Sequence, residues 1–268
     1  PASRHIIAWT RIFRFRTEEM DDGRAELHGR DQLGAQEVRL REELPLLEWA
    51  LAETERQRTA IPPAVRVKAL YSVATGASWL GDTARARSLL EQCLEIEEEG
   101  GSWPQSCAIL SSLAEINEWE GNYPQALQLD ERYLALSRAH GYTQGVADAL
   151  NQIGELLRLQ GDYVQASQVL RESLVLRKAV GTVTGIAATQ GYLGITLYEL
   201  GELQEAHQLL TDSLQRGYAL GDKMMVAGVL TELGVVAQLR GDYRTADQYQ
   251  RDALTLLDEL GFKPTAHW

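Results

Sequence analysis

The stretch Gly161-Asp162-Tyr163 decides the fold, because a glycine-led turn of this kind returns along the chain every 40 residues. The other turns of this series begin at Gly81, Gly121, Gly201 and Gly241. A second glycine series lies midway between them, at Gly101, Gly141, Gly181, Gly221 and Gly261. Glycine ends helices well because it enters the left-handed conformation without a Cβ penalty. Each segment between turns, about 17 residues, fits one helix of roughly 25 Å. A fixed period of this size indicates a repeat array.

Four columns of equivalent residues predict how these helices pack. An alanine comes five residues after each turn glycine: Ala86, Ala126, Ala166, Ala206 and Ala246. Leucines follow eight residues later and are expected to add apolar area on the same side: Leu94, Leu134, Leu174, Leu214 and Leu254. The other helix of each unit carries an apolar column: Val73, Leu113, Ile153, Leu193 and Leu233. The next residue is always small: Ala74, Ala114, Gly154, Gly194 and Gly234. Alanine and glycine at fixed places mark close helix contacts, and the apolar stripes require neighbouring helix pairs to stack.

The internal pattern of each unit distinguishes between kinds of solenoid. A 40-residue period alone would also suit HEAT or armadillo arrays. Ile153-Gly154, the turn at Gly161, Ala166 and Ser173 together resemble the tetratricopeptide pattern. The unit is longer than the usual length of about 34 residues, and the proline expected after the second helix is missing. The resemblance implies an all-α fold, a right-handed superhelical α-solenoid of tetratricopeptide helix-turn-helix repeats. Its five units span 62–101, 102–141, 142–181, 182–221 and 222–261, within a repeat region of 61–268 that ends in a short tail.

Residues 1–60 are predicted to form a helical junction or capping segment. Residues 3–20 mix apolar side chains with four arginines and favour an amphipathic helix, although an organellar transit peptide shares this composition. A second helix is expected over 33–57. Residues 27–51 resemble the junction of MalT/AfsR-type (STAND) signal-transduction ATPases, which links the NTPase part to a C-terminal tetratricopeptide array. The absence of an initiating methionine at Pro1 is interpreted as a domain excised from a longer polypeptide or a processed product.

Composition and motifs argue against several classes of function. The net charge is −12, which opposes direct nucleic-acid binding and disfavours anionic membranes. No apolar run approaches the ~20 residues that span a bilayer. The chain lacks a phosphate-binding glycine loop, and its five histidines do not fall at metal-ligand spacings. We therefore expect no catalytic residues, no metal and no cofactor in this segment. The two cysteines suggest a reducing compartment, and hence a cytoplasmic location.

A binding surface is expected on the first helix of each unit, because the resemblance places the concave groove of the solenoid there. Several first-helix columns vary between units, unlike the core columns, and varied polar groups suit recognition of a peptide, a partner helix or a sugar. The alternative is that these positions vary because they are merely solvated. The candidate residues are Tyr71, Thr75, Ser78, Glu115, Glu118, Asn151, Gln152, Glu155, Arg158, Tyr192, Tyr198, Glu232 and Gln238.

Three functional hypotheses follow. The first is a non-catalytic sensing and interaction domain of a larger bacterial regulator ATPase, which would bind a protein, a peptide or a small inducer such as an oligosaccharide. The second is a stand-alone scaffold or adaptor that gathers protein partners. The third is a peptide-pheromone receptor. Residues 27–51 favour the first hypothesis. In a longer array, an apolar face near Leu256, Leu257 and Leu260 would be open and could mediate self-association.

Overall fold

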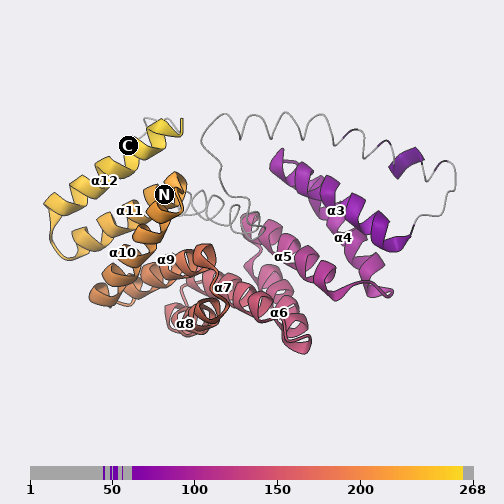
Figure 1. Ribbon diagram of the computed structural model, residues 1–268, viewed down its shortest axis with the longest axis horizontal. Coiled ribbons are helices and arrows are strands. Elements are labelled where there is room, and N and C mark those ends of the chain that lie inside the picture. Colours follow the sequence, from indigo (N-terminus) through magenta and orange to yellow (C-terminus); the bar gives the residue numbers. More distant parts are fainter. Residues whose placement is uncertain (1–44, 46–48, 50, 54–55, 57–61, 262–268) are drawn as a thin grey trace. The chain divides into compact units, whose positions relative to one another are not determined.

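The computed structural model describes residues 45, 49, 51–53, 56 and 62–261. Residues 62–261 are helical throughout apart from short turns, and contain no strand (Figure 1). The helices are α3 (Pro63–Trp79), α4 (Thr83–Glu98), α5 (Trp103–Trp119), α6 (Tyr123–Ala139), α7 (Thr143–Leu159), α8 (Tyr163–Val180), α9 (Val183–Glu199), α10 (Leu203–Ala219), α11 (Lys223–Leu239) and α12 (Tyr243–Glu259). The predicted helices over 3–20 and 33–57 and the tail beyond residue 261 lie outside the described residues, apart from those few positions.

The turns form as the glycine series predicts. Gly161 has φ +84°, and a Cβ atom there would meet nothing within 4 Å, so the left-handed backbone rather than crowding requires glycine. The next residue, Asp162, starts α8 by accepting a hydrogen bond from the Gln165 backbone nitrogen at 3.1 Å. The predicted turn glycine of the first repeat is displaced by one residue: positive φ occurs at Gly100 and not at Gly101.

Each repeat is held by a close contact between its two helices. A Cβ atom on Gly154 would lie 2.6 Å from Cγ of Leu170, and one on Gly194 would lie 2.7 Å from Cγ of Leu210. Only a residue without a side chain fits these two places. The alanine column and the apolar column are buried throughout, as predicted. The all-α fold of helix-turn-helix repeats is therefore confirmed.

The leucine column is the exception. Only Leu174 is buried, and Leu254 on α12 is 46% exposed. The residue just before it in each repeat is buried instead: Cys93, Tyr133, Ser173, Ser213 and Ala253. The leucines therefore lie at the edge of the buried stripe rather than in its centre.

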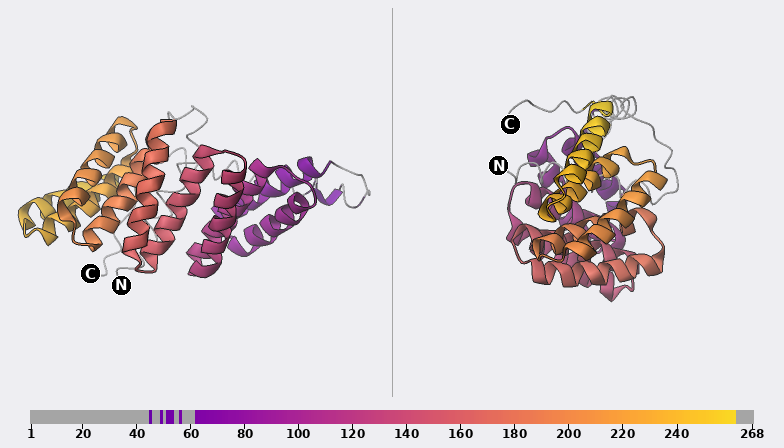
Figure 2. Two further views of the ribbon diagram at one scale, coloured as in Figure 1. Left: turned by 90° about the horizontal axis from the view of Figure 1, so that it is seen from below. Right: turned by 90° about the vertical axis from the view of Figure 1, so that its left-hand side faces the viewer.

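The described residues divide into two compact units, 62–145 and 146–261, and the division falls in the first turn of α7. In the second unit, the consecutive helices α9 and α10, and α11 and α12, pack as pairs (Figures 1 and 2). Ser173 Oγ donates to the Ala147 carbonyl at 2.7 Å, and Ser213 Oγ makes the same bond to Ala187 at 2.8 Å. In the first unit Cys93 Sγ contacts the Val67 carbonyl at 3.6 Å. All three contacts link residues 26 apart and tie the second helix to the first.

Candidate functional site

The first helices of the unit 146–261 carry polar residues that meet across helix boundaries. Thr189 Oγ1 on α9 donates to Asn151 Oδ1 on α7 at 2.8 Å. Tyr198 Oη, farther along α9, donates to Glu232 Oε2 on α11 at 2.7 Å. The helices α7, α9 and α11 are thus neighbours, although each belongs to a different repeat.

A buried ion pair lies on α7 in the same region. Glu155 is completely buried, and its Oε1 lies 3.9 Å from Nη2 of Arg158, whose side chain is 7% exposed. This distance is an ion-pair contact but exceeds hydrogen-bond length. Within residues 62–261 the structure shows no hydrogen bond from the Arg158 guanidinium, and its Nε atom is fully buried. A guanidinium has five N–H donors, so this is an unusual state for a buried arginine.

Electrostatics connect this ion pair to the Tyr198–Glu232 hydrogen bond. Burial raises the pKa of Glu232, and Glu199 raises it further, while the Tyr198 hydrogen bond and the charge of Arg158 lower it. Burial also raises the pKa of Tyr198, and Glu232 adds to that rise, whereas Arg158 opposes it. Arg158 therefore acts on both groups. We call Glu155, Arg158, Tyr198 and Glu232 the first-helix cluster.

The other predicted site residues of this unit lie in different surroundings. Gln152 and Tyr192 are buried, as is Asn151, whereas Gln238 is exposed. Two polar residues of α9 were not predicted: Thr189, which donates to Asn151, and Gln190, whose Oε1 accepts a 3.0 Å hydrogen bond from Arg216 Nε. The only signal in the sequence was that these two polar residues interrupt a small and apolar run that begins at Gly185.

The remaining predicted site residues belong to the unit 62–145. Tyr71 Oη lies 3.2 Å from Ser112 Oγ, which joins α3 to α5. Thr75 is exposed and donates to the carbonyl of Tyr71 within its own helix. Ser78 and Glu115 are half-buried and Glu118 is buried. These residues belong to the other unit and are not part of the first-helix cluster.

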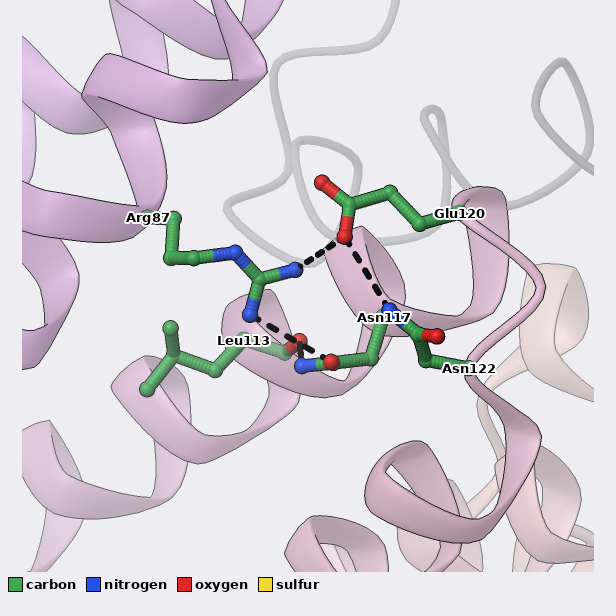
Figure 3. Close-up of polar contacts among 5 residues, drawn as sticks. All are labelled: Arg87, Leu113, Asn117, Glu120 and Asn122. Atoms are coloured by element: carbon green, nitrogen blue, oxygen red, sulfur yellow. Dashed lines mark hydrogen bonds and ion pairs between the residues drawn. The ribbon is translucent and has the colours of Figure 1, made fainter.

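A second arginine cluster lies in the unit 62–145 and was not predicted (Figure 3). Arg87 on α4 donates through Nη1 to Asn117 Oδ1 at 3.3 Å and through Nη2 to Glu120 Oε2 at 2.6 Å. Asn117 in turn donates to the Leu113 carbonyl at 2.7 Å, and Asn122 donates to the same Glu120 carboxylate at 3.2 Å. The cation lies at the C-terminal end of α5, where the helix dipole favours positive charge. We call these residues the Arg87 cluster, and its bonds suit a structural role.

The described residues offer little catalytic chemistry. No group of three or more His, Cys, Asp and Glu among them could hold a metal ion. Burial raises the pKa of the Cys93 thiol to about 11, and it also raises the pKa of Cys107. Such thiols are poor nucleophiles because the thiolate is scarce. In the part of the chain that the structure describes, no helix is long and apolar enough to cross a bilayer.

The class of protein follows from these helix pairs: an all-α solenoid of the tetratricopeptide kind. Residues 145–219, which include α8, α9 and α10, match the tetratricopeptide repeat family. That match includes Glu155, Arg158 and Tyr198. No curated protein matches the sequence.

Solved structures agree on the fold. BtubC (BKLC) from P. vanneervenii is 18% identical, with a TM-score of 0.68 over 85% of this chain and 95% of that one. The apo form of RapI is 16% identical, with a TM-score of 0.65 over 96% of this chain and 76% of that one. Aspartyl phosphate phosphatase F from Bacillus subtilis is 11% identical, with a TM-score of 0.64 over 86% and 71%. At these identities the likeness shows the fold alone, which is a tetratricopeptide-type scaffold suited to protein–protein interaction.

Proposed function

We propose that this chain is a non-catalytic partner-binding module whose binding face is formed by α7, α9 and α11. The first-helix cluster lies at the centre of that face. The observation that carries the proposal is the state of Arg158, a buried arginine for which the described residues provide an ion pair at 3.9 Å and no hydrogen bond.

Stability alone does not account for this cluster. Burying an ion costs on the order of several kcal/mol. The attraction between the two buried charges offsets this cost only when their geometry is good and additional hydrogen bonds are made. The 3.9 Å separation of Arg158 and Glu155 supplies neither. Ile195 and Val235 occupy the places equivalent to Glu155 in the next two repeats, so an apolar residue is compatible with the packing at that position. A binding role explains why the charges are kept.

The best-suited partner is a protein or a peptide, since the face spans three parallel repeats and carries aromatic and amide groups beside its charges. A small inducer such as an oligosaccharide is the alternative occupant of the same face. We further propose that the five repeats of this chain, over 62–261, form the sensing part of a larger protein. That protein would be a cytoplasmic ATPase regulator of the MalT/AfsR type. Residues 27–51 support this context through their resemblance to the junction of such regulators.

A matched pair of variants tests the binding face. The double variant Glu155→Ala, Arg158→Ala should lose the partners that the unchanged chain captures from extracts of its source cells, while its helix content stays the same. The control is Asp247→Ala, Arg251→Ala, which removes an equivalent ion pair that is well exposed on α12. Partners retained equally by both variants would exclude the face of α7, α9 and α11.

The intact mass of the native product tests the larger context. A mass several-fold above 29.8 kDa would support an attached ATPase. A mass near 29.8 kDa would favour the stand-alone scaffold or the peptide receptor, and the binding face would be unaffected.

A further inference from the structure

We infer that the turn between α8 and α9 is a binding site for a phosphate group, formed by Arg177 and by the first turn of α9. None of its residues belongs to the first-helix cluster, so this site stands apart from the proposed binding face. The inference follows from the donors that converge at this turn and from the charges around them.

Arg177 is a buried arginine with unused hydrogen-bond donors. It lies in the last turn of α8 and is only 8% exposed. Its Nη2 forms an ion pair with Asp148 Oδ1 on α7 at 2.9 Å. Its Nε is buried without a hydrogen-bond partner, and among the described residues the structure shows no acceptor for Nη1. A guanidinium has five N–H donors, so most of those of Arg177 are open to a ligand.

The Nη1 side of the guanidinium lies against the first turn of α9. A Cβ atom on Gly185 would collide with Nη1 of Arg177 and would lie 2.8 Å from its Cζ. The same Cβ position is 3.0 Å from Oγ1 of Thr182. The guanidinium and this hydroxyl therefore converge at the place where Gly185 has no side chain.

The start of α9 adds backbone donors to the same place. Thr182 is the N-cap residue, but its side chain makes no capping hydrogen bond, and the first turn of α9 contains no acidic residue. The first N–H groups of a helix have no partner within the helix and favour an anion. At the start of α8 the carboxylate of Asp162 fills this role by accepting from the Gln165 backbone nitrogen. At α9 an external anion can take the place of such a carboxylate, with Arg177 as its counter-ion.

The charges and the number of donors favour phosphate. Arg177 and its exposed neighbour Lys178 carry two positive charges, against one negative charge on Asp148, whose side chain is 28% exposed. A phosphate group has enough oxygens to accept from a guanidinium, a hydroxyl and backbone N–H groups at the same time, whereas a carboxylate has two. Asp148 competes with the anion for the guanidinium, so its charge should weaken phosphate binding.

Titration of the full chain with inorganic phosphate tests the site, with sodium chloride holding the ionic strength constant. We expect saturable shifts of the backbone amide resonances of Val183 and Thr184 in NMR spectra. Arg177→Gln should raise the Kd for phosphate about tenfold or more, because it removes a charged donor. The matched control Lys178→Gln removes the same charge from an exposed neighbouring position and should raise Kd less than about twofold.

A second variant tests the site even if Arg177→Gln fails to fold. Asp148→Asn keeps an oxygen that accepts from Nη2 and removes the competing charge, so it should lower the Kd for phosphate about threefold. Unchanged or weaker phosphate binding in Asp148→Asn would overturn the inference. Equal losses in Arg177→Gln and Lys178→Gln would do the same, and so would amide shifts that sodium chloride alone reproduces.

The source of the phosphate is distinguished by a second probe, O-phosphoserine. Tighter binding of O-phosphoserine than of inorganic phosphate would support a site for a phosphate monoester. Equal or weaker binding would support a site for the free ion. Absence of saturable shifts with both probes would overturn the inference and leave the proposed binding face of α7, α9 and α11 unaffected.

Discussion

Two arginines in this molecule, Arg87 and Arg158, differ in how the chain satisfies their hydrogen-bond donors. Arg87 is 26% exposed and forms hydrogen bonds to Asn117 and Glu120 (Figure 3). Arg158 is 7% exposed and has one ion-pair contact at 3.9 Å. The more accessible arginine is therefore the better satisfied one. This reverses the usual rule that burial of a charge demands full hydrogen bonding.

The difference fits a structural role for the Arg87 cluster and the proposed binding role of the first-helix cluster. The Arg87 cluster closes the end of α5 against α4 with groups from the chain itself, so it needs nothing else. In the first-helix cluster, the buried Arg158 guanidinium makes no hydrogen bond to any described residue. Sites that bind ligands commonly hold polar groups in such states, because the ligand completes them.

The largest effect is expected from removing both charges of the buried pair. The double variant Glu155→Leu, Arg158→Met should raise the free energy of unfolding by about 1–4 kcal/mol, since apolar residues avoid the cost of burying two ions. Urea unfolding measures the change, and partner binding should be lost in the same variant. A destabilised protein would mean that the pair is structural, and the contrast with Arg87 would disappear.

The next effect tests the repeat register on which the comparison depends. Gly154→Leu should lower the free energy of unfolding by about 1–3 kcal/mol, because its side chain would overlap Leu170. Gly234→Leu is the matched control: a Cβ atom there would lie 2.7 Å from Nε2 of Gln250, the end of a flexible side chain, so the cost should be smaller. Unchanged thermal unfolding of Gly154→Leu would contradict the alignment of the units.

A smaller loss is expected at the satisfied arginine. Arg87→Met should cost about 0.5–1.5 kcal/mol, the net value of a typical hydrogen bond, because partly exposed groups regain water as a partner. Denaturant unfolding gives the cost, and capture of partners from cell extracts should be unchanged. A loss of binding would show that the Arg87 cluster also has a part in recognition.

The smallest effect concerns pH. Because the pKa of Glu232 is raised on folding, the folded protein keeps a proton that the unfolded chain releases above the usual glutamate pKa of about 4.3. Protonated Glu232 therefore adds to the free energy of unfolding at low pH. This contribution is lost as the pH rises through the raised pKa of the folded protein. Glu232→Gln should flatten the decline, as unfolding at a series of pH values would show. An identical pH profile in both proteins would contradict the raised pKa.

The sequence predicts the fold well because each feature of the repeat has a local cause. Gly161 adopts positive φ, and Gly154 leaves room for the Leu170 side chain. Because each repeat needs a small residue at these places, the requirement is visible as a recurring position in the sequence. The leucines add apolar area beside the core, as Leu94 and Leu214 show, but period alone does not distinguish the centre of a buried stripe from its edge. Leu254 recurs as faithfully as its equivalents but is the most exposed of them.

The first-helix cluster could be predicted only in part. Glu155, Arg158, Tyr198 and Glu232 were all among the candidates because their columns vary. Their partners could not be predicted, because the Tyr198–Glu232 bond joins residues 34 apart on two different repeats. The burial of Glu155 also gave no signal, since a glutamate in a varying column reads as solvated. The role of the cluster in binding stays a prediction.

The packing of α12 has a consequence for how the protein opens. Only Ala246 and Ala253 of this helix are buried, whereas most residues of α11 are buried. In a solenoid each element is stabilised by its immediate neighbours, so the helix with the smallest buried area should fray first. Brief detachment of α12 would uncover Val226 and Leu230 of α11, which pack with Ala253. Amide hydrogen exchange in this unit would then be fastest in its last helix, and transient association between molecules would begin there.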